Sequence, residues 1–207
     1  VTGHEGFIGR NMTSWLHQEP EWEIDGYEWN KNERPDVSNY DWVVHLGAIA
    51  DMACTDVDAI LEQNLEFSQW LFTQCNKHGV HLQYASSSSV YGNTKDFSET
   101  AQCHPQTPYA WSKYLFERYV EQHPANIRVQ GFRYFNVYGD GQHESGLYAP
   151  VIGKFLKQKS NNESLTVVGD GLQKRDFTHV SDVVEANILA ATTLNEKIIG
   201  ETFNVGS

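Results

Sequence analysis

The sequence is poor in cysteine, in positive charge and in long hydrophobic runs, and each shortage excludes a class of protein. Its three cysteines, Cys54, Cys75 and Cys103, are too widely separated in 207 residues for a disulfide framework or a zinc motif. We therefore expect a reducing compartment, the cytoplasm, and no bound metal. The chain has 15 Lys and Arg against 27 Asp and Glu, a net charge of -12 that argues against following a nucleic-acid backbone.

No apolar run approaches the roughly 20 residues that a transmembrane helix requires. No basic and apolar leader precedes Gly3, so insertion into a membrane is not expected. Hydrophobic residues make up 40% of the chain, which is enough to fill the core of one sizeable domain.

Segments with strand character alternate with segments of helical periodicity, which is typical of parallel βαβ units. The pattern predicts an α/β fold. Strands are expected at 22–29, 41–48, 80–89, 127–135, 164–171 and 201–207. Helices are expected after the opening turn, where Ile8, Met12, Trp15 and Leu16 fall on one helical stripe, and at 57–78, 109–122, 148–158 and 181–194, the last one capped by Ser181.

Glycines recur at every third position in the opening segment VTGHEGFIG, at Gly3, Gly6 and Gly9. Between a strand and a helix, this spacing lets the backbone turn tightly and approach a pyrophosphate, whose charge then meets the helix N-terminus. The alternative is a turn that needs glycine for conformational reasons alone. The position of the motif in the chain favours dinucleotide binding.

An acidic residue follows at the distance expected for recognition of the adenosine ribose. Glu28 lies near the end of the expected strand at 22–29, about 20 residues beyond the last glycine, and this favours NAD as the cofactor. Asp25 on the same segment is the competing choice, and Glu28 as an ordinary solvated carboxylate is the other alternative. Lys31 and Arg34 are near enough to accommodate a 2'-phosphate, so NADP stays open.

The segment YAWSK places Tyr109 and Lys113 one helical turn apart, so both side chains emerge on one face. A nearby ammonium favours the phenolate, which predicts a tyrosine pKa lowered from about 10 toward the neutral range. Such a group can accept the proton of a sugar hydroxyl. Ser87, at the polar end of the preceding strand, is placed to donate a hydrogen bond to the same oxygen.

Taken together, these motifs resemble the extended short-chain dehydrogenase/reductase family, and in particular its nucleotide-sugar epimerases and dehydratases. The resemblance covers nearly the whole chain, and the matching pieces stand in the family's order. They are VTGHEGFIG, VVHLGA, EQNLEFS with Asn64, YASSSSVYG, TPYAWSK, GFRYFNVYG and GDGLQKRDFTHVSDVVEAN.

The resemblance implies a Rossmann-type doubly wound parallel sheet with part of a small C-terminal substrate domain. It implies an NAD-binding domain at 1–138, with its first strand mostly missing, and the incomplete start of a substrate-binding region at 139–207. The chain therefore resembles a family member truncated at both ends. It also implies a homodimer, with the helical residues Phe116, Tyr119 and Val120 as interface residues or, alternatively, as core.

The resemblance also assigns roles to individual residues. The cofactor site would comprise Gly3, Gly6, Phe7, Ile8, Gly9, Glu28, Ala48, Tyr109 and Lys113. Tyr109 would be the acid/base, and Lys113 would hold the nicotinamide ribose. Ser87 would bind the reacting sugar oxygen, with Ser86, Ser88 and Ser89 as rivals. Asn136 and Arg175 would grip the substrate diphosphate, with a turn-forming role as the alternative for Asn136.

Three departures from the family pattern limit the interpretation. The segment between Glu28 and Asp41 is shorter than usual, so the adenine contact would fall to PDV at 35–37. The serine stretch lacks the Asp-Glu pair of the 4,6-dehydratases and the glutamate of the decarboxylases, which argues against elimination. TKDFSE and SKYLFERYV resemble ADP-heptose 6-epimerases, yet GDGQHESG at 139–146 lacks the lysine of that group.

With these residues, the resemblance implies an NAD-dependent epimerase that inverts C4 of a UDP-sugar through a transient 4-keto intermediate. The substrate would be a nucleotide-diphosphate sugar. The alternatives are an ADP-heptose 6-epimerase and a keto-sugar reductase with His143 or Cys103 as an additional acid. A dinucleotide-binding protein without catalysis is a further alternative, against which the presence of Ser87, Tyr109 and Lys113 argues.

Overall fold

The computed structural model describes residues 1–51, 54–143, 150–193 and 200–206. At its centre is a four-stranded sheet in the order β1-β2-β3-β6, in which every neighbouring pair is parallel. The strands are β1 (Trp42–His45), β2 (His81–Ser87), β3 (Val129–Tyr134) and β6 (Thr202–Val205). Parallel neighbours need long crossover connections, and helices fill them.

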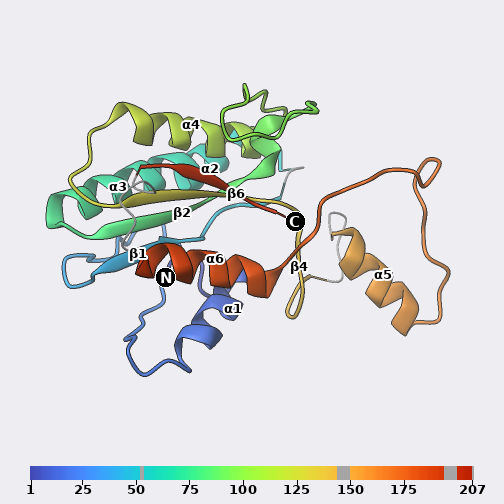
Figure 1. Ribbon diagram of the computed structural model, residues 1–207, viewed down its shortest axis with the longest axis horizontal. Helices are drawn as coiled ribbons and strands as arrows, with labels where there is room; N and C mark the ends of the chain where they lie inside the picture. The colour runs from blue at the N-terminus through green and yellow to red at the C-terminus, as the bar shows by residue number, and fades with distance from the viewer. Residues whose placement is uncertain (52–53, 144–149, 194–199, 207) are drawn as a thin grey trace.

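Helices cover both faces of this sheet (Figure 1). One face carries α2 (Val57–Ile60), the π-helical segment η1 (Leu61–Glu66), α3 (Phe67–His78) and α4 (Pro108–Gln122). The opposite face carries α1 (Phe7–Leu16) and α6 (Val180–Thr192). The α/β, doubly wound architecture predicted from the sequence is therefore confirmed.

The core is divided by the sheet into separate clusters. On the face of α3 and α4 it includes Phe67, Leu71, Leu82 and Phe116, and on the other face Met12, Leu16 and Val184. Phe116 is only 3% exposed and packs edge-to-face on Tyr84. Of the two alternatives given for Phe116, dimer interface or core, the structure supports the core, because the side chain is already buried within one chain.

A short N-terminal segment continues the sheet beyond β1. Thr2 forms parallel bridges both to His45 and to Tyr27, so it lies between them. The Tyr27 backbone donates to Val1 O (2.9 Å) and accepts from Gly3 N (2.8 Å). The predicted strand at 22–29 is reduced to this one bridge, because Val1 to Gly3 provide the only backbone that pairs with it among the described residues.

Two further predictions differ from the structure. Segment 164–171 forms no strand, and its Leu165, Val167 and Val168 side chains are exposed without a neighbouring strand to pair with. Helix α6 is capped by His179 rather than Ser181: the His179 side chain accepts from Ser181 N. The remaining predicted strands and helices are present, with shifts at their ends. Residues 148–149, 194 and 207, which belong to predicted elements, lie outside the described part of the chain.

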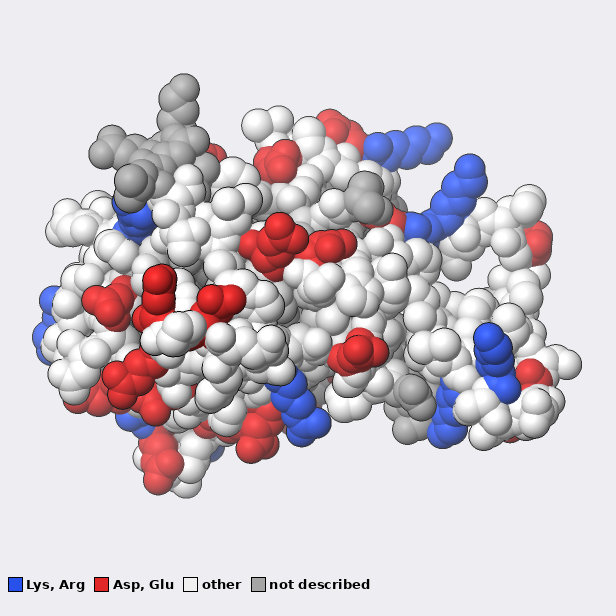
Figure 2. Space-filling model, turned by 60° about the horizontal axis from the view of Figure 1, so that its bottom comes forward, with Lys and Arg blue, Asp and Glu red and all other residues white. Residues whose placement is uncertain are grey.

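Beyond the main sheet, β4 (Val137–Tyr138) pairs with β5 (Thr178–His179). Helix α5 (Val151–Ser160) lies apart from the sheet, at the right of Figure 1. In the space-filling view acidic side chains are scattered over the main body, and lysines and arginines are fewer (Figure 2). Within the described residues, no helix is both long enough and apolar enough to span a bilayer.

Candidate active site

The predicted site residues follow the carboxyl ends of neighbouring strands. The glycine turn follows Thr2, Ala48 follows β1, Ser87 ends β2 and Asn136 follows β3. In a parallel sheet these ends meet at one edge, and ligands of open α/β sheets bind there. The topology therefore gathers residues that are far apart in the sequence at one edge of the sheet.

In the glycine turn, backbone atoms of different segments approach one another closely. Gly3 has φ +69°, and a Cβ there would lie 2.5 Å from Gly47 Cα. A Cβ on Gly9 would lie 2.0 Å from Gly3 O. Larger residues are therefore excluded at both positions, and the turn lies against the HLGA segment that contains Ala48.

Helix α1 begins at Phe7 with Gly6 as its N-cap, and no side chain caps it. Its first turn contains no acidic residue. The backbone N–H groups of Phe7, Ile8 and Gly9 therefore stay available at the positive end of the helix dipole. A glycine cradle in front of an uncapped helix fits the pyrophosphate of a dinucleotide.

Glu28 lies beside this turn. Its Oε1 accepts from Glu5 N (2.7 Å) and lies 3.2 Å from His4 Nδ1. The competing residue Asp25 instead accepts from the Tyr40 hydroxyl (2.7 Å), which raises the pKa of Tyr40. Of the two carboxylates, Glu28 is the one that contacts the glycine turn.

Ser87, Tyr109 and Lys113 lie together. The Ser87 side chain lies near enough to Tyr109 that hydrogen bonding between them lowers the pKa of the phenol, and Lys113 Nζ lies 5.9 Å from the centre of the Tyr109 ring. The rivals of Ser87 are engaged elsewhere: Ser86 donates to Glu117, and the Ser89 hydroxyl donates to Ser87 Oγ (2.9 Å). Ser88 begins the 3₁₀ turn η2 (Ser88–Tyr91) that Ser87 caps.

The sequence predicted that the pKa of Tyr109 is lowered, and for the chain by itself this prediction is wrong. Burial raises the pKa of Tyr109, and the hydrogen bond with Ser87 opposes this only in part. The reason is that the phenol is taken out of water while the Lys113 ammonium lies over the ring instead of bonding the oxygen.

Lys113 is itself buried, with 5% of its surface exposed. Burial lowers its pKa to about 8, and the nearby Glu117 carboxylate limits the fall. No carboxylate forms an ion pair with it in the described part of the chain. A buried ammonium without an ion pair suits contact with the hydroxyls of a bound ligand.

A buried asparagine connects the cofactor side to the helix of Tyr109. Asn64, in the π-helical segment η1, accepts from Ile49 N (2.8 Å) and donates to Ile49 O (3.0 Å) and Ser112 Oγ (3.2 Å). Ser112 in turn donates to Tyr109 O (2.7 Å). The chain of bonds fixes the loop after β1 relative to α4.

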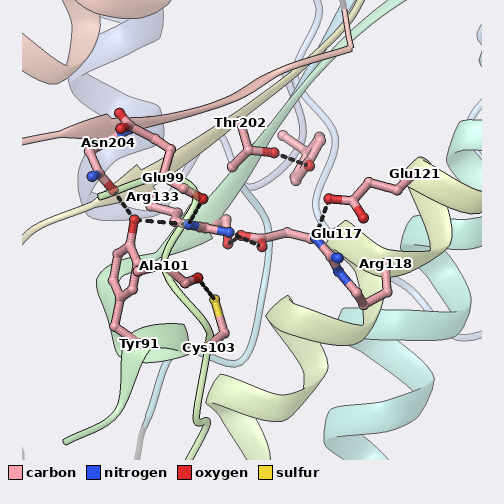
Figure 3. A network of polar contacts seen from close by, with 12 residues as sticks. Tyr91, Glu99, Ala101, Cys103, Glu117, Arg118, Glu121, Arg133, Thr202 and Asn204 are labelled. Atoms are coloured by element: carbon pink, nitrogen blue, oxygen red, sulfur yellow. Dashed lines mark hydrogen bonds and ion pairs between the residues drawn. The ribbon is translucent and has the colours of Figure 1, made fainter. Parts of the chain in front are cut away.

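A buried ion pair attaches α4 to the sheet (Figure 3). Arg133 on β3 donates to Glu117 Oε1 (3.0 Å) and Oε2 (2.7 Å), and both side chains are almost fully buried. Burial alone would lower the pKa of Arg133, but the bonds to Glu117 raise it. Arg133 also donates to the Tyr91 hydroxyl (2.8 Å), which donates to Asn204 on β6 (2.7 Å).

Sequence reasoning missed the roles of Glu117 and Asn64. Glu117 follows Tyr109 and Lys113 along one face of α4, and an acidic residue on a face that packs on the sheet was the available signal. Asn64 stands within a motif, but its contacts depend on the π-helical turn, which sequence periodicity does not reveal.

The two residues expected to bind the substrate diphosphate lie outside the group of Ser87, Tyr109 and Lys113. Asn136, at φ +27°, donates to Asp176 O (2.7 Å), so it adjoins the segment that contains Arg175. Arg175 is exposed, and its guanidinium donates to Lys174 O (2.8 Å). His143 is exposed in the loop after β4, and burial raises the pKa of Cys103.

A cavity of about 450 Å³ lies next to the glycine turn but not at Tyr109. Its walls include Thr2, segment 22–27, residues 35–37 and β1. Ser87, Tyr109 and Lys113 do not line it. The predicted adenine contact at 35–37 therefore borders a real cavity, which is separate from the group of Ser87, Tyr109 and Lys113.

The fold and site define a dinucleotide-binding α/β protein of the short-chain dehydrogenase type. The pattern of the NAD dependent epimerase/dehydratase family matches residues 28–206, and the chain belongs to this family. NAD is the cofactor of this family, and the glycine cradle and open helix end fit it.

Named relatives agree with this assignment. The ADP-L-glycero-D-manno-heptose-6-epimerase of Thiobacillus denitrificans is 35% identical over 174 residues, which are 80% of this chain and 52% of the relative. The chain therefore spans about half the length of this curated relative.

Solved structures of 4-epimerases have the same fold. The Thermotoga maritima UDP-glucose 4-epimerase, solved with UDP-glucose, aligns with a TM-score of 0.84 at 28% identity, covering 100% of this chain and 76% of that one. The Bacillus cereus UDP-glucuronic acid 4-epimerase, solved with NAD, aligns with a TM-score of 0.88 at 27% identity and the same coverage.

Proposed function

We propose that the protein is an NAD-dependent nucleotide-sugar epimerase that inverts C4 of a UDP-sugar. The observation that carries the proposal is the group formed by Ser87, Tyr109 and Lys113 at the carboxyl edge of the sheet, the same edge as the glycine turn. The named 4-epimerases of the same fold support the choice of reaction.

In this proposal Gly3, Gly6 and Gly9 with the N–H groups of Phe7 and Ile8 hold the pyrophosphate of NAD. Glu28 binds the adenosine ribose, and Lys113 binds the nicotinamide ribose. Ala48 lines the site beside the turn. When bound, NAD supplies reversible hydride transfer, which makes a transient 4-keto sugar possible.

Tyr109 takes the proton of the C4 hydroxyl and returns it after the sugar has turned over. Ser87 hydrogen-bonds the same sugar oxygen and so holds it at the phenol. Because burial raises the pKa of Tyr109, the phenolate requires positive charge nearby. The Lys113 ammonium, still protonated below its pKa of about 8, supplies part of this charge.

The substrate diphosphate is assigned to Asn136 and Arg175. Their connection through Asp176 supports a shared role, and an arginine suits a phosphate because of its planar, bidentate donors. We further propose that residues 1–138 form the NAD-binding domain and that 139–207 begin the substrate-binding region.

We propose that the protein is cytoplasmic and forms a homodimer. The exposed apolar residues of α4, Trp111 (47%) and Leu115 (38%), support a contact on this helix, in place of the buried Phe116.

The test follows UDP-glucose and UDP-N-acetylglucosamine by proton NMR in D2O with a trace of NAD. The expected result is the C4 epimer without deuterium at carbon, because the hydride returns within the site. No conversion by a protein that binds NAD would contradict the C4 assignment. Consumption of reduced cofactor in proportion to product would instead indicate a reductase.

ADP-heptose 6-epimerisation is the second candidate function. The 35% identity with the Thiobacillus denitrificans enzyme favours it, although the lysine expected within 139–146 is absent. Adding an ADP-heptose to the same NMR assay separates the two functions: only the C6 epimerase converts it.

A further inference from the structure

The glycine turn carries a histidine that contacts the acidic residue assigned to the adenosine ribose. His4 lies between Gly3 and Gly6, and its Nδ1 is 3.2 Å from Glu28 Oε1. The Nδ1 atom is shielded from solvent, and its alignment with Oε1 falls short of a hydrogen bond. A lone pair facing a carboxylate would be repelled, so we assign the N–H to Nδ1.

A second contact holds the same carboxylate oxygen. Glu5 N donates to Glu28 Oε1 at 2.7 Å, so one backbone N–H and one imidazole meet at this atom. The other oxygen, Oε2, has no hydrogen-bond partner in the described part of the chain, and 44% of the Glu28 side chain is exposed. Oε2 is therefore the acceptor left for a ligand hydroxyl.

The position of the imidazole is itself determined by a glycine. A Cβ added to Gly26 would lie 2.2 Å from His4 Cδ2 and 2.5 Å from His4 Nε2. Gly26 precedes Tyr27, which pairs with Thr2 and so ties this segment to the turn. The ring is held against the Gly26 backbone and cannot move away from Glu28 on that side.

We infer that His4 is a positioning residue that makes the site select NAD over NADP. With Glu28 Oε1 bonded by Glu5 N and in contact with His4 Nδ1, Oε2 can accept from the ribose hydroxyls of NAD. The same carboxylate repels a 2'-phosphate, because both groups are negatively charged and its contacts with His4 and Glu5 keep it at this position. This inference rests on the proposed function, since it takes Glu28 as the ribose ligand.

The test measures the dissociation constants of NAD and NADP by isothermal titration calorimetry. The wild-type protein is expected to bind NADP at least about tenfold more weakly than NAD, the scale of one charge-assisted contact. In His4→Ala the ratio of the NADP dissociation constant to the NAD dissociation constant is expected to fall about threefold to tenfold, because the Glu28 carboxylate loses its contact with the imidazole. His4→Asn keeps an N–H donor close to the Nδ1 position and is expected to stay within about twofold of wild type.

Further variants separate this role from a general effect on the fold. Gly26→Ala displaces the ring and is expected to reproduce the ratio of His4→Ala. His78→Ala, an exposed histidine at the end of α3, is the matched control and should leave the ratio unchanged. In a Glu28→Gln background, His4→Ala should no longer alter the ratio, since it acts through the carboxylate.

The outcomes distinguish this inference from the proposed function. If the wild-type protein binds NAD and His4→Ala retains the full ratio, the inference is wrong and the proposed function stands. The inference is also wrong if His4→Ala has the same effect with and without the Glu28 carboxylate. If the wild-type protein binds neither dinucleotide, both are wrong.

Discussion

Tyr109 depends on its neighbours for its chemistry. Burial raises the pKa of its phenol, and hydrogen bonding by Ser87 opposes that effect only in part. The Tyr109 residue is still partly exposed, so a bound ligand can contact it. The residue is therefore suited to proton transfer with a bound ligand.

Replacing Tyr109 by phenylalanine removes one oxygen atom and keeps the ring. We expect turnover of the nucleotide sugar to fall by about 10² to 10⁴-fold, the contribution of a positioned acid/base. The dissociation constant of NAD, measured by calorimetry, should change by less than about threefold because the pyrophosphate cradle is intact. Tyr114→Phe on the same helix is the control, and near-normal turnover in Tyr109→Phe would remove this residue from the mechanism.

At the scale of elements, α4 is attached to the sheet by charge as well as by apolar contacts. Glu117 joins it to Arg133 on β3, and Ser86 at the end of β2 donates to the same carboxylate. Since Ser86 precedes Ser87, this attachment positions the serine and the Tyr109 helix together. The apolar contact of Phe116 with Tyr84 lies next to it on the helix.

Breaking this buried pair should be costly. Glu117→Gln leaves the Arg133 charge uncompensated, and we expect the free energy of unfolding in urea to fall by about 3 to 5 kcal/mol. The control is the exposed ion pair of Arg118 and Glu121 on the same helix, which Figure 3 also shows. Glu121→Gln should cost less than about 1 kcal/mol, because exposed pairs are weak. Equal losses in the two variants would contradict the assigned role.

At the scale of the whole molecule, a buried histidine connects the N-terminal segment to the sheet and to α3. His45 bonds Thr2 Oγ1 (2.7 Å) through Nδ1 and Ser68 Oγ (2.8 Å) through Nε2. Burial lowers the pKa of His45 to about 3, and the positive charge of Lys113 adds to the effect. The folded protein therefore contains a neutral imidazole at its centre.

This histidine should make the protein sensitive to acid. In the unfolded chain an imidazole binds a proton below about pH 6.5, whereas folded His45 stays neutral down to about pH 3. Protons thus stabilise the unfolded state, and this group should lower the free energy of unfolding by about 2 kcal/mol between pH 7 and pH 5.

Urea unfolding at pH 7 and at pH 5 measures this loss. In His45→Gln the decrease between the two pH values should be smaller by about 2 kcal/mol than in wild type, whatever the variant costs at pH 7. His104→Gln, at an exposed position, serves as the control. An unchanged decrease in His45→Gln would show that His45 does not carry the acid sensitivity.

Local pattern was sufficient to predict most of the helices and strands. Periodicity identified the long helices, and the four-residue spacing of Tyr109 and Lys113 correctly placed them on one face of α4. Periodicity failed at segment 164–171, where apolar residues have no strand beside them, and at 22–29, where pairing is confined to Tyr27. Strand formation depends on a partner that the local sequence does not reveal.

The amino-acid sequence by itself determined the α/β class, the glycine turn and the residue types of the site, because these depend on spacings within single segments. Only the tertiary structure decided that Ser87 contacts Tyr109, that Glu28 contacts His4, and that burial raises the pKa of the phenol. It also decided that Glu117 pairs with Arg133 in the interior. Such contacts join distant segments, and solvent exposure is a property of the packed chain, so neither can be read from local pattern.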